Sequence, residues 1–235
     1  MALIGRERPG EDRDGVTDRD MDAQSYAEAV FVQEDRYLKE IKEDIRARGM
    51  PAIFVPPVVG AFIHWMAKSH DSQAILEIGA LGGYSGLWLA RALRQPGGRL
   101  VSLELNPEYA RVAESHLTKA GLGDVVEYRV GPALESLQQL DRENARFDFF
   151  LIDADKENYP EYLQWCVRLA APRAIIVADN ALQGGRVYAV EHREPSTEAV
   201  RRFNQLAAAD PRLRALLLPI GDGLVVAEVV APGLA

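Results

Sequence analysis

Phe147-Asp-Phe-Phe-Leu-Ile-Asp-Ala-Asp-Lys156 is an apolar run that ends abruptly in oxygen-bearing side chains, and Ile175-Ile-Val-Ala-Asp-Asn180 has the same pattern. Such runs are typical of buried parallel strands, which deliver functional groups to the carboxyl edge of an open α/β sheet. Asp153, Asp179 and Asn180 therefore are candidates to converge on one hard cation. Each of them alone would also fit a strand end or a helix cap.

Strand candidates alternate with helical stretches through the middle of the chain. This alternation requires right-handed crossovers and predicts an α/β fold, with a mostly parallel sheet covered by helices on both faces. The last two β-rich runs are joined by Ile220-Gly-Asp-Gly223, which is typical of a hairpin and predicts a terminal antiparallel strand. The predicted strands are Ala74–Ile78, Arg99–Glu104, Val125–Val130, Phe147–Asp153, Ala174–Asp179, Leu213–Pro219 and Leu224–Val230.

The N-terminal part divides into a charged arm and helical stretches. Residues 1–20 are dense in Arg, Asp, Glu and Gly, which predicts a flexible arm. Helical spacing of apolar residues predicts one helix over Met21–Arg48 and another over Pro57–Lys68. We expect residues 21–235 to form a single domain, with the N-terminal helices in 21–70 and the core in 74–230. The apolar stripe of the first helix needs a partner surface and predicts a homodimer.

The composition limits the possible partners and compartments. The 235 residues are 48% hydrophobic and carry a formal net charge of −8, with no stretch that interleaves basic and aromatic residues. A small-molecule partner is therefore expected, and a nucleic-acid partner is not. One cysteine, Cys166, excludes an intrachain disulfide framework. Without a long apolar run or a signal-peptide pattern, we expect a cytoplasmic protein with no membrane partner.

A glycine-rich turn, Glu77-Ile-Gly-Ala-Leu-Gly-Gly-Tyr-Ser85, follows the first predicted strand and opens a helix. Glycine allows the backbone to turn sharply and to approach a ligand closely. The spacing is not the G-x-G-x-x-G of a dinucleotide cradle, which argues against a bound pyrophosphate. Glu104 ends the second strand, where an acidic side chain can bond both hydroxyls of an adenosine ribose. The two features together favour an adenosine-bearing cofactor without a pyrophosphate.

Four motifs, in this order, resemble the cation-dependent, S-adenosylmethionine-dependent O-methyltransferases, the family of caffeoyl-CoA and catechol O-methyltransferases and their bacterial members. The resemblance implies a class I methyltransferase, a Rossmann-like sandwich of seven strands with the last antiparallel. It also implies methyl transfer to a hydroxyl of a small aromatic acceptor with vicinal oxygens, of the catechol or hydroxycinnamoyl type. The motifs are Leu76-Glu-Ile-Gly-Ala-Leu-Gly-Gly-Tyr-Ser85, Phe147-Asp-Phe-Phe-Leu-Ile-Asp-Ala-Asp-Lys156, Val177-Ala-Asp-Asn180 and Leu218-Pro-Ile-Gly-Asp-Gly-Leu224.

The resemblance implies roles for the residues at the two strand ends. Asp153, Asp179 and Asn180 match the ligands of a divalent cation, with Mg²⁺ expected and Mn²⁺ or Ca²⁺ as alternatives. Three protein oxygens leave half of an octahedral shell open for a chelating acceptor and water. Lys156 matches the general base, and desolvation together with a nearby cation makes a lysine amine a better base.

The resemblance further implies a site for S-adenosylmethionine. Glu77, Gly79 and Ser85 match contacts to its amino-acid portion, Glu104 matches the ribose contact and Asp155 matches the contact to the methionine amino group. The other cofactor contacts are Val55, Gly83, Tyr84, Ala133 and Asp153. The chain departs from the family pattern at Pro132, where an aspartate is usual, and at Gln183, where a tryptophan is usual. After the second departure, an aromatic wall of the acceptor pocket is either missing or provided by Tyr188.

Two alternatives remain open on the sequence. A nicotinamide-dependent oxidoreductase would share the sheet and Glu104 but would leave Asp153, Asp179 and Asn180 without a role. A non-catalytic relative that binds S-adenosylmethionine would keep the glycine turn, although the presence of Lys156 and all three oxygen ligands argues against it.

Overall fold

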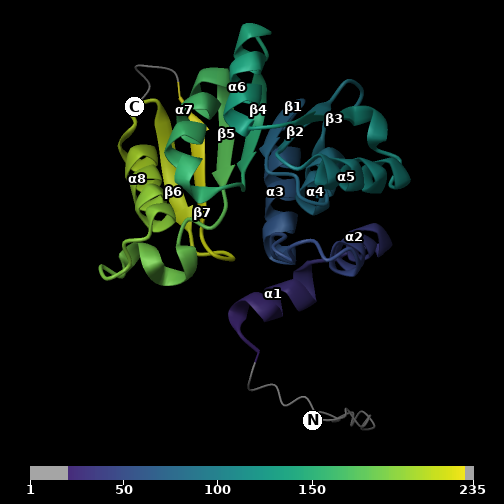
Figure 1. Ribbon diagram of the computed structural model, residues 1–235, viewed down its shortest axis with the longest axis horizontal. Coiled ribbons are helices and arrows are strands. Elements are labelled where there is room, and N and C mark those ends of the chain that lie inside the picture. The colour runs from purple at the N-terminus through teal and green to yellow at the C-terminus, as the bar shows by residue number, and fades with distance from the viewer. Residues whose placement is uncertain (1–20, 231–235) are drawn as a thin grey trace, which may run out of the picture.

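A seven-stranded sheet with the order β3-β2-β1-β4-β5-β7-β6 forms the centre of the molecule (Figure 1). The computed structural model describes residues 21–230, so the predicted arm at residues 1–20 and the residues from 231 to 235 lie outside this description. Apolar runs form the central strands because both faces of the sheet are buried. The strands are β1 Ala74–Ile78, β2 Arg99–Glu104, β3 Val126–Val130, β4 Phe147–Ile152, β5 Ala170–Ala178, β6 Leu213–Leu218 and β7 Leu224–Val229.

The strand directions confirm the predicted topology. The pairs among β1 to β5 are parallel, whereas β7 pairs antiparallel with both β5 and β6. In the central register, Ile152 of β4 lies between Ile78 of β1 and Ala178 of β5. The next residues continue the ladder, because the Asp153 N–H donates to the Ile78 carbonyl and the Asp179 N–H donates to the Ile152 carbonyl. Gly79, Asp153 and Asp179 therefore end neighbouring strands at one edge.

Helices cover both faces of the sheet (Figure 1). Alternate residues of β4 point to opposite faces, so Phe149 packs in the core with α2 to α5 and Phe150 packs in the core with α6 to α8. The helices of the first face are α2 Arg36–Ala47, α3 Pro57–Ser69, α4 Tyr84–Ala92 and α5 Pro107–Lys119. The helices of the second face are α6 Ala133–Arg142, α7 Tyr159–Leu169 and α8 Pro195–Ala209.

The prediction of one continuous helix over Met21–Arg48 is wrong. The chain forms α1, Ala23–Phe31, and then a separate α2, with an extended break between them. The Asp35 side chain accepts the Leu38 N–H and caps α2, which starts a new helix although the apolar spacing continues across the break. The Glu34 carboxylate, within the break, accepts a hydrogen bond from the Tyr84 hydroxyl of α4. This contact connects the break to the core.

Several strand boundaries also differ from the prediction, and β4, β5, β6 and β7 each end one residue earlier than expected. β3 begins one residue later because the short 3-10 turn η1, Gly123–Val125, precedes it, and β5 begins at Ala170 with an irregularity in its pairing to β4. Two further turns, η2 Lys156–Asn158 and η3 Gln183–Tyr188, follow β4 and β5. Across residues 21–230, none of the helices has the length and apolar character needed to cross a bilayer.

Candidate active site

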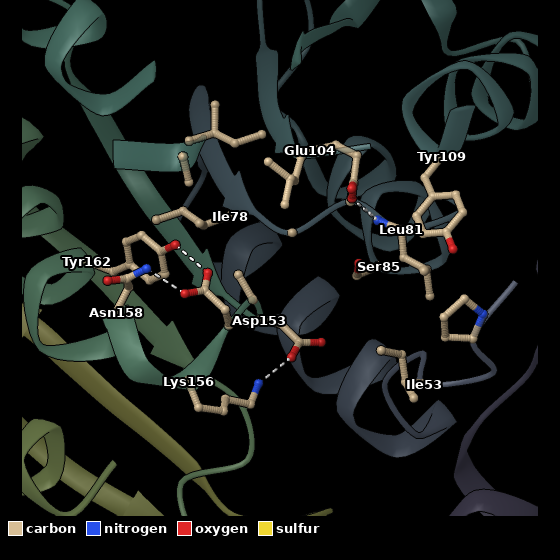
Figure 2. Close-up of a pocket in the computed structure, with 18 of the residues that line it drawn as sticks. Ile53, Ile78, Leu81, Ser85, Glu104, Tyr109, Asp153, Lys156, Asn158 and Tyr162 are labelled. Atoms are coloured by element: carbon tan, nitrogen blue, oxygen red, sulfur yellow. Dashed lines mark hydrogen bonds and ion pairs between the residues drawn. The ribbon is translucent and has the colours of Figure 1, made fainter. Parts of the chain in front are cut away.

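A cavity of about 850 Å³ opens at the carboxyl edge of the sheet, around the ends of β1, β2 and β4 (Figure 2). Open α/β sheets bind their ligands at this edge. Most of the site residues predicted from the sequence line the cavity. Four do not, namely Glu77, Gly83, Asp179 and the candidate wall residue Tyr188, which is exposed. The predicted residues that line it are Val55, Gly79, Tyr84, Ser85, Glu104, Ala133, Asp153, Asp155, Lys156 and Asn180.

The glycine turn shapes one wall of the cavity. Gly79 has φ +101°, and a Cβ there would overlap the Asp153 carbonyl oxygen, so only glycine lets the ends of β1 and β4 approach this closely. Gly83 caps α4 in a left-handed conformation, and its Cα faces Ala113 and Leu117 of α5. Gly83 therefore serves the packing of the turn, and a direct contact between Gly83 and a cofactor stays a prediction.

Glu104 is held rigidly at the end of β2. Its two carboxylate oxygens accept the backbone N–H groups of Leu81, at 2.8 Å, and of Asn106, at 2.9 Å. Each carboxylate oxygen keeps a further lone pair that can accept another hydrogen bond. The carboxylate can therefore receive a pair of hydroxyls, as expected for a ribose, while its position is fixed by the turn. Ala133 and its neighbours Pro132 and Leu134 add an apolar wall.

Asp155 is fixed by two side chains that the sequence analysis did not single out. Its Oδ1 accepts the Tyr162 hydroxyl at 2.6 Å, and its Oδ2 accepts the Asn158 side-chain amide at 2.5 Å (Figure 2). Asn158 and Tyr162 also line the cavity. Their positions three and seven residues after Asp155 are a helical spacing, which is the one signal in the sequence that could have indicated them.

Glu77 lies behind the cavity wall and not in it. Its buried carboxylate accepts the Ser85 hydroxyl at 2.6 Å and the Ser102 hydroxyl at 2.5 Å. Burial is the main cause that raises the pKa of Glu77 to about 7, and the two serine hydroxyls partly offset it. Glu77 thus orients Ser85, which does line the cavity, and its predicted contact with the cofactor itself stays a prediction.

The three predicted metal ligands are brought to neighbouring strand ends. Asp179 is only 2% exposed, and its Oδ1 accepts the Asn180 N–H at 2.7 Å. Burial, followed by the charge of Asp153, raises the pKa of Asp179 to about 7. A buried carboxylate beside a second carboxylate is the donor set that a hard cation stabilises, so these residues fit a divalent ion.

Other metal-ligating residues do not gather elsewhere in the described part of the chain. Over residues 21–230, no cluster of three or more His, Cys, Asp and Glu side chains is arranged to hold a metal ion. The three predicted ligands are not a cluster of this kind, because they combine the carboxylates of Asp153 and Asp179 with the amide oxygen of Asn180.

Lys156 sits beside this acidic pair. Its Nζ lies 3.0 Å from Asp153 Oδ1 and donates to the Tyr159 hydroxyl at 2.7 Å. Tyr159 is buried, and its hydroxyl lies 3.1 Å from the carbonyl oxygen of Asp179, so it connects the lysine to the end of β5. Tyr159 was not predicted as a site residue, because an aromatic residue at a helix start is most often a core residue, and Tyr159 is also buried in the core.

The chain matches known O-methyltransferases over most of its length. The model of the O-methyltransferase family matches residues 28–230. A catechol O-methyltransferase from Niastella koreensis is 40% identical over 210 residues, which is 87% of this chain and 95% of the relative. An O-methyltransferase from Bacillus cereus, solved in complex with SAH, has a TM-score of 0.83 and 40% identity, with 88% of this chain and 96% of that chain covered.

A second solved structure gives the same result. The O-methyltransferase TomG from Streptomyces achromogenes, in complex with SAM, has a TM-score of 0.82 and 36% identity over 88% of this chain and 96% of that chain. The resemblance read from the four motifs is confirmed at the level of the family, and the expected class I methyltransferase fold is confirmed as well. By sequence and by fold, this chain belongs to the O-methyltransferase family.

Proposed function

We propose that the protein transfers the methyl group of S-adenosylmethionine to one hydroxyl of a small aromatic acceptor with vicinal oxygens, and that a divalent cation takes part. The observation that carries this proposal is that Glu104 and Ser85 line the same cavity as Asp153, Lys156 and Asn180. In Figure 2, Glu104 lies with Ser85 on one side and Lys156 lies across the cavity from them. A donor bound at one end can therefore meet an acceptor at the other.

The methyl donor fits the rigid half of the cavity. The Glu104 carboxylate accepts the two ribose hydroxyls, the turn from Gly79 to Ser85 borders the amino-acid portion, and Asp155 pairs with the ammonium group. Tyr162 and Asn158 hold Asp155 in place for this contact. The structures of relatives bound to SAH and SAM support the choice of donor.

A divalent cation would be held by Asp153, Asp179 and the amide oxygen of Asn180. Such an ion lowers the pKa of a bound hydroxyl and orients a chelating acceptor. The buried position of Asp179 beside a second carboxylate supports this assignment. Mg²⁺ is the proposed ion, and Mn²⁺ and Ca²⁺ are alternatives because the same oxygen ligands accept all three.

Lys156 is proposed as the general base. In its neutral form, the amine accepts the proton of the acceptor hydroxyl, and the oxygen then attacks the methyl carbon. The new C–O bond forms as the S–C bond breaks, so the products are a methyl ether and S-adenosylhomocysteine. Tyr159 and Asp153 fix the position of Nζ, which aligns it for the proton transfer.

The acceptor class rests on the catechol O-methyltransferase from Niastella koreensis and on the chelating geometry that three protein ligands leave open. Hydroxycinnamoyl compounds are the alternative with the same pair of oxygens. The apolar residues Ile53, Pro51 and Phe54 line the cavity and suit an aromatic ring. The family membership, together with Lys156, favours this enzyme over a non-catalytic relative and over a nicotinamide-dependent oxidoreductase.

The test is methyl transfer to catechol with and without a chelator. The metal-free protein is incubated with isotopically labelled S-adenosylmethionine and catechol, first in EDTA and then with Mg²⁺ in excess. We expect the label in the methyl ether only after Mg²⁺ is added, with the methylated position assigned by NMR. Equal turnover in EDTA would rule out the role of the cation, and a protein that binds the donor but methylates no catechol or hydroxycinnamate would rule out the acceptor class.

We also propose that the protein is a homodimer, through the apolar surface of α1 and α3. The stripe of α2 is already buried in the core at Leu38, Ile41 and Ile45, so it needs no partner. The exposed apolar side chains are instead Tyr26, Val30 and Phe31 on α1 and Trp65 on α3. Light scattering would reject this proposal if it gives the mass of one chain.

A further inference from the structure

His116 on α5 lies under the glycine turn and contacts two different parts of the protein. Its Nδ1 lies 2.8 Å from the Gly82 carbonyl oxygen, and its Nε2 lies 3.1 Å from Oδ2 of Asp44 on α2. The ring is largely buried, with 11% of the side chain exposed. One imidazole thus joins the turn that borders the cavity to a helix of the N-terminal part.

The Gly82 end of this link belongs to the proposed donor site. Gly82 lines the cavity, and the preceding Leu81 has a left-handed φ of +45°. A Cβ on Gly82 would lie 2.6 Å from Cδ1 of Ile45, so α2 packs directly against the turn. A displacement of α2 or of the His116 ring would therefore disturb the turn that borders the proposed donor site.

The hydrogen-bond partners of His116 determine which protonation state of the ring can make both contacts. A backbone carbonyl and a carboxylate can only accept hydrogen bonds, and a neutral imidazole has a single N–H to donate. The ring satisfies both oxygens only when both nitrogens carry hydrogen, which is the charged form. The complete link therefore depends on the protonation state of the ring.

The charged groups around the ring come from α2 and α5. Asp44 faces it from α2, and Arg48, which follows the last residue of α2, donates to the same carboxylate oxygen that His116 contacts. Lys119, one turn further along α5, pairs with Glu40 of α2 at 2.6 Å. Lys119 therefore joins the same two helices as His116 but does not touch the turn, which makes it a matched control.

We propose that His116 is a positioning residue for the methyl donor: its doubly protonated ring fixes the Gly82 carbonyl against α2, and loss of one proton loosens the turn and weakens donor binding. This inference rests on the proposed function, because it assigns the regulation of the same donor site. It concerns a residue that touches neither the donor nor the acceptor.

The experiment compares H116A, D44A and K119M with the wild type, using calorimetric titration of S-adenosylhomocysteine from pH 6 to 8.5. We expect H116A to bind about tenfold more weakly than the wild type at pH 6, because a charge-assisted contact is lost, and K119M to bind like the wild type. D44A leaves the ring a single acceptor, which a neutral ring can satisfy, so it should lose the weakening with rising pH that the wild type shows. Glu77 is present in all four proteins, so the effect of its titration on the affinity for S-adenosylhomocysteine should cancel when they are compared.

Two further measurements separate positioning from loss of structure. Hydrogen exchange of residues 79–85 without any ligand should speed up in H116A and stay unchanged in K119M. In steady-state assays, the KM for the donor should rise in H116A while the KM for the acceptor stays the same. Thermal unfolding shows whether H116A is misfolded. In that case D44A decides, and the inference is overturned if the affinity of D44A falls with rising pH as much as that of the wild type.

The inference is overturned if H116A binds S-adenosylhomocysteine like the wild type, or if K119M loses as much affinity as H116A, since general docking of α2 would then explain the effect. Should the wild type itself fail to bind S-adenosylhomocysteine, the proposed donor is refuted, and the exchange of residues 79–85 still decides whether His116 orders the turn.

Discussion

Gly79 and Asp153 meet backbone to backbone where β1 and β4 end, so closely that any Cβ on Gly79 would overlap the Asp153 carbonyl oxygen. This contact places the glycine turn, which borders the proposed donor, directly beside the strand end that carries Asp153 and Lys156. The two halves of the proposed site are therefore connected by one close approach and not by a flexible loop.

The first prediction follows from this contact. G79A should lower the free energy of unfolding by more than about 2 kcal/mol, because it combines an unfavourable left-handed φ with a steric overlap. G121A is the matched control: Gly121 also has a positive φ, but a Cβ there would meet nothing within 4 Å. That variant should lose only about 1 kcal/mol. Urea unfolding of both variants measures the difference, and equal losses would show that the overlap is relieved at little cost.

The second prediction concerns Lys156. K156M and K156R should both lower kcat by roughly 10²–10⁴-fold, while the affinity for S-adenosylhomocysteine stays unchanged. The arginine variant keeps a positive charge beside Asp153 but cannot accept a proton at neutral pH, so it separates proton transfer from ion pairing. Replacement of the exposed Lys39 by methionine is the control. Substantial activity in K156R would show that the side chain contributes charge and not a base.

The strands could be predicted well because the physics that forms them is visible in the sequence. Buried parallel strands are continuous apolar runs, and the oxygen-bearing residues that end them, such as Asp153 and Asp179, mark the edge where ligands bind. The break before Asp35 was missed because the apolar periodicity continues through it, whereas the chain becomes extended at Val32 and the Asp35 cap starts a new helix.

The side chains that hold the predicted site residues in place were the least predictable part of the site. Tyr159 and Tyr162 have the apolar spacing of core residues, and His116 is one of four histidines with no ligand spacing. The contacts of His116 join residues far apart in the sequence, so no local pattern encodes them. Tyr159 and Tyr162 contact Lys156 and Asp155 at helical spacing, but that spacing is equally typical of core residues. Glu77 differs from these residues, because a motif singled it out as a cofactor contact, whereas the fold places its carboxylate behind Ser85.

The third prediction tests the cation site without measuring turnover. In EDTA, D179N should be more stable than the wild type, because it buries a neutral amide where the wild type buries a carboxylate beside Asp153. Added Mg²⁺ should raise the Tm of the wild type and leave that of D179N unchanged, because a ligand that binds only the folded state stabilises it. D124N, a substitution at an exposed aspartate in η1, should respond to Mg²⁺ like the wild type. A Tm of the wild type that does not change with Mg²⁺ would argue against the site.

The last prediction uses the buried carboxyl of Glu77, whose pKa is raised to about 7 in the folded protein from an ordinary value of 4.5. Between these two values the folded state binds more protons than the unfolded chain, so the stabilising contribution is complete below pH 4.5 and is lost as the pH rises through 7. The free energy of unfolding of the wild type should therefore fall by roughly 2–3 kcal/mol relative to E77Q between pH 5 and pH 8. Urea unfolding at several pH values measures this difference, with E161Q, at an exposed position of α7, as the control. If E77Q and the wild type follow parallel curves, the Glu77 carboxyl ionises without cost, and the hydroxyls of Ser85 and Ser102 compensate fully for its burial.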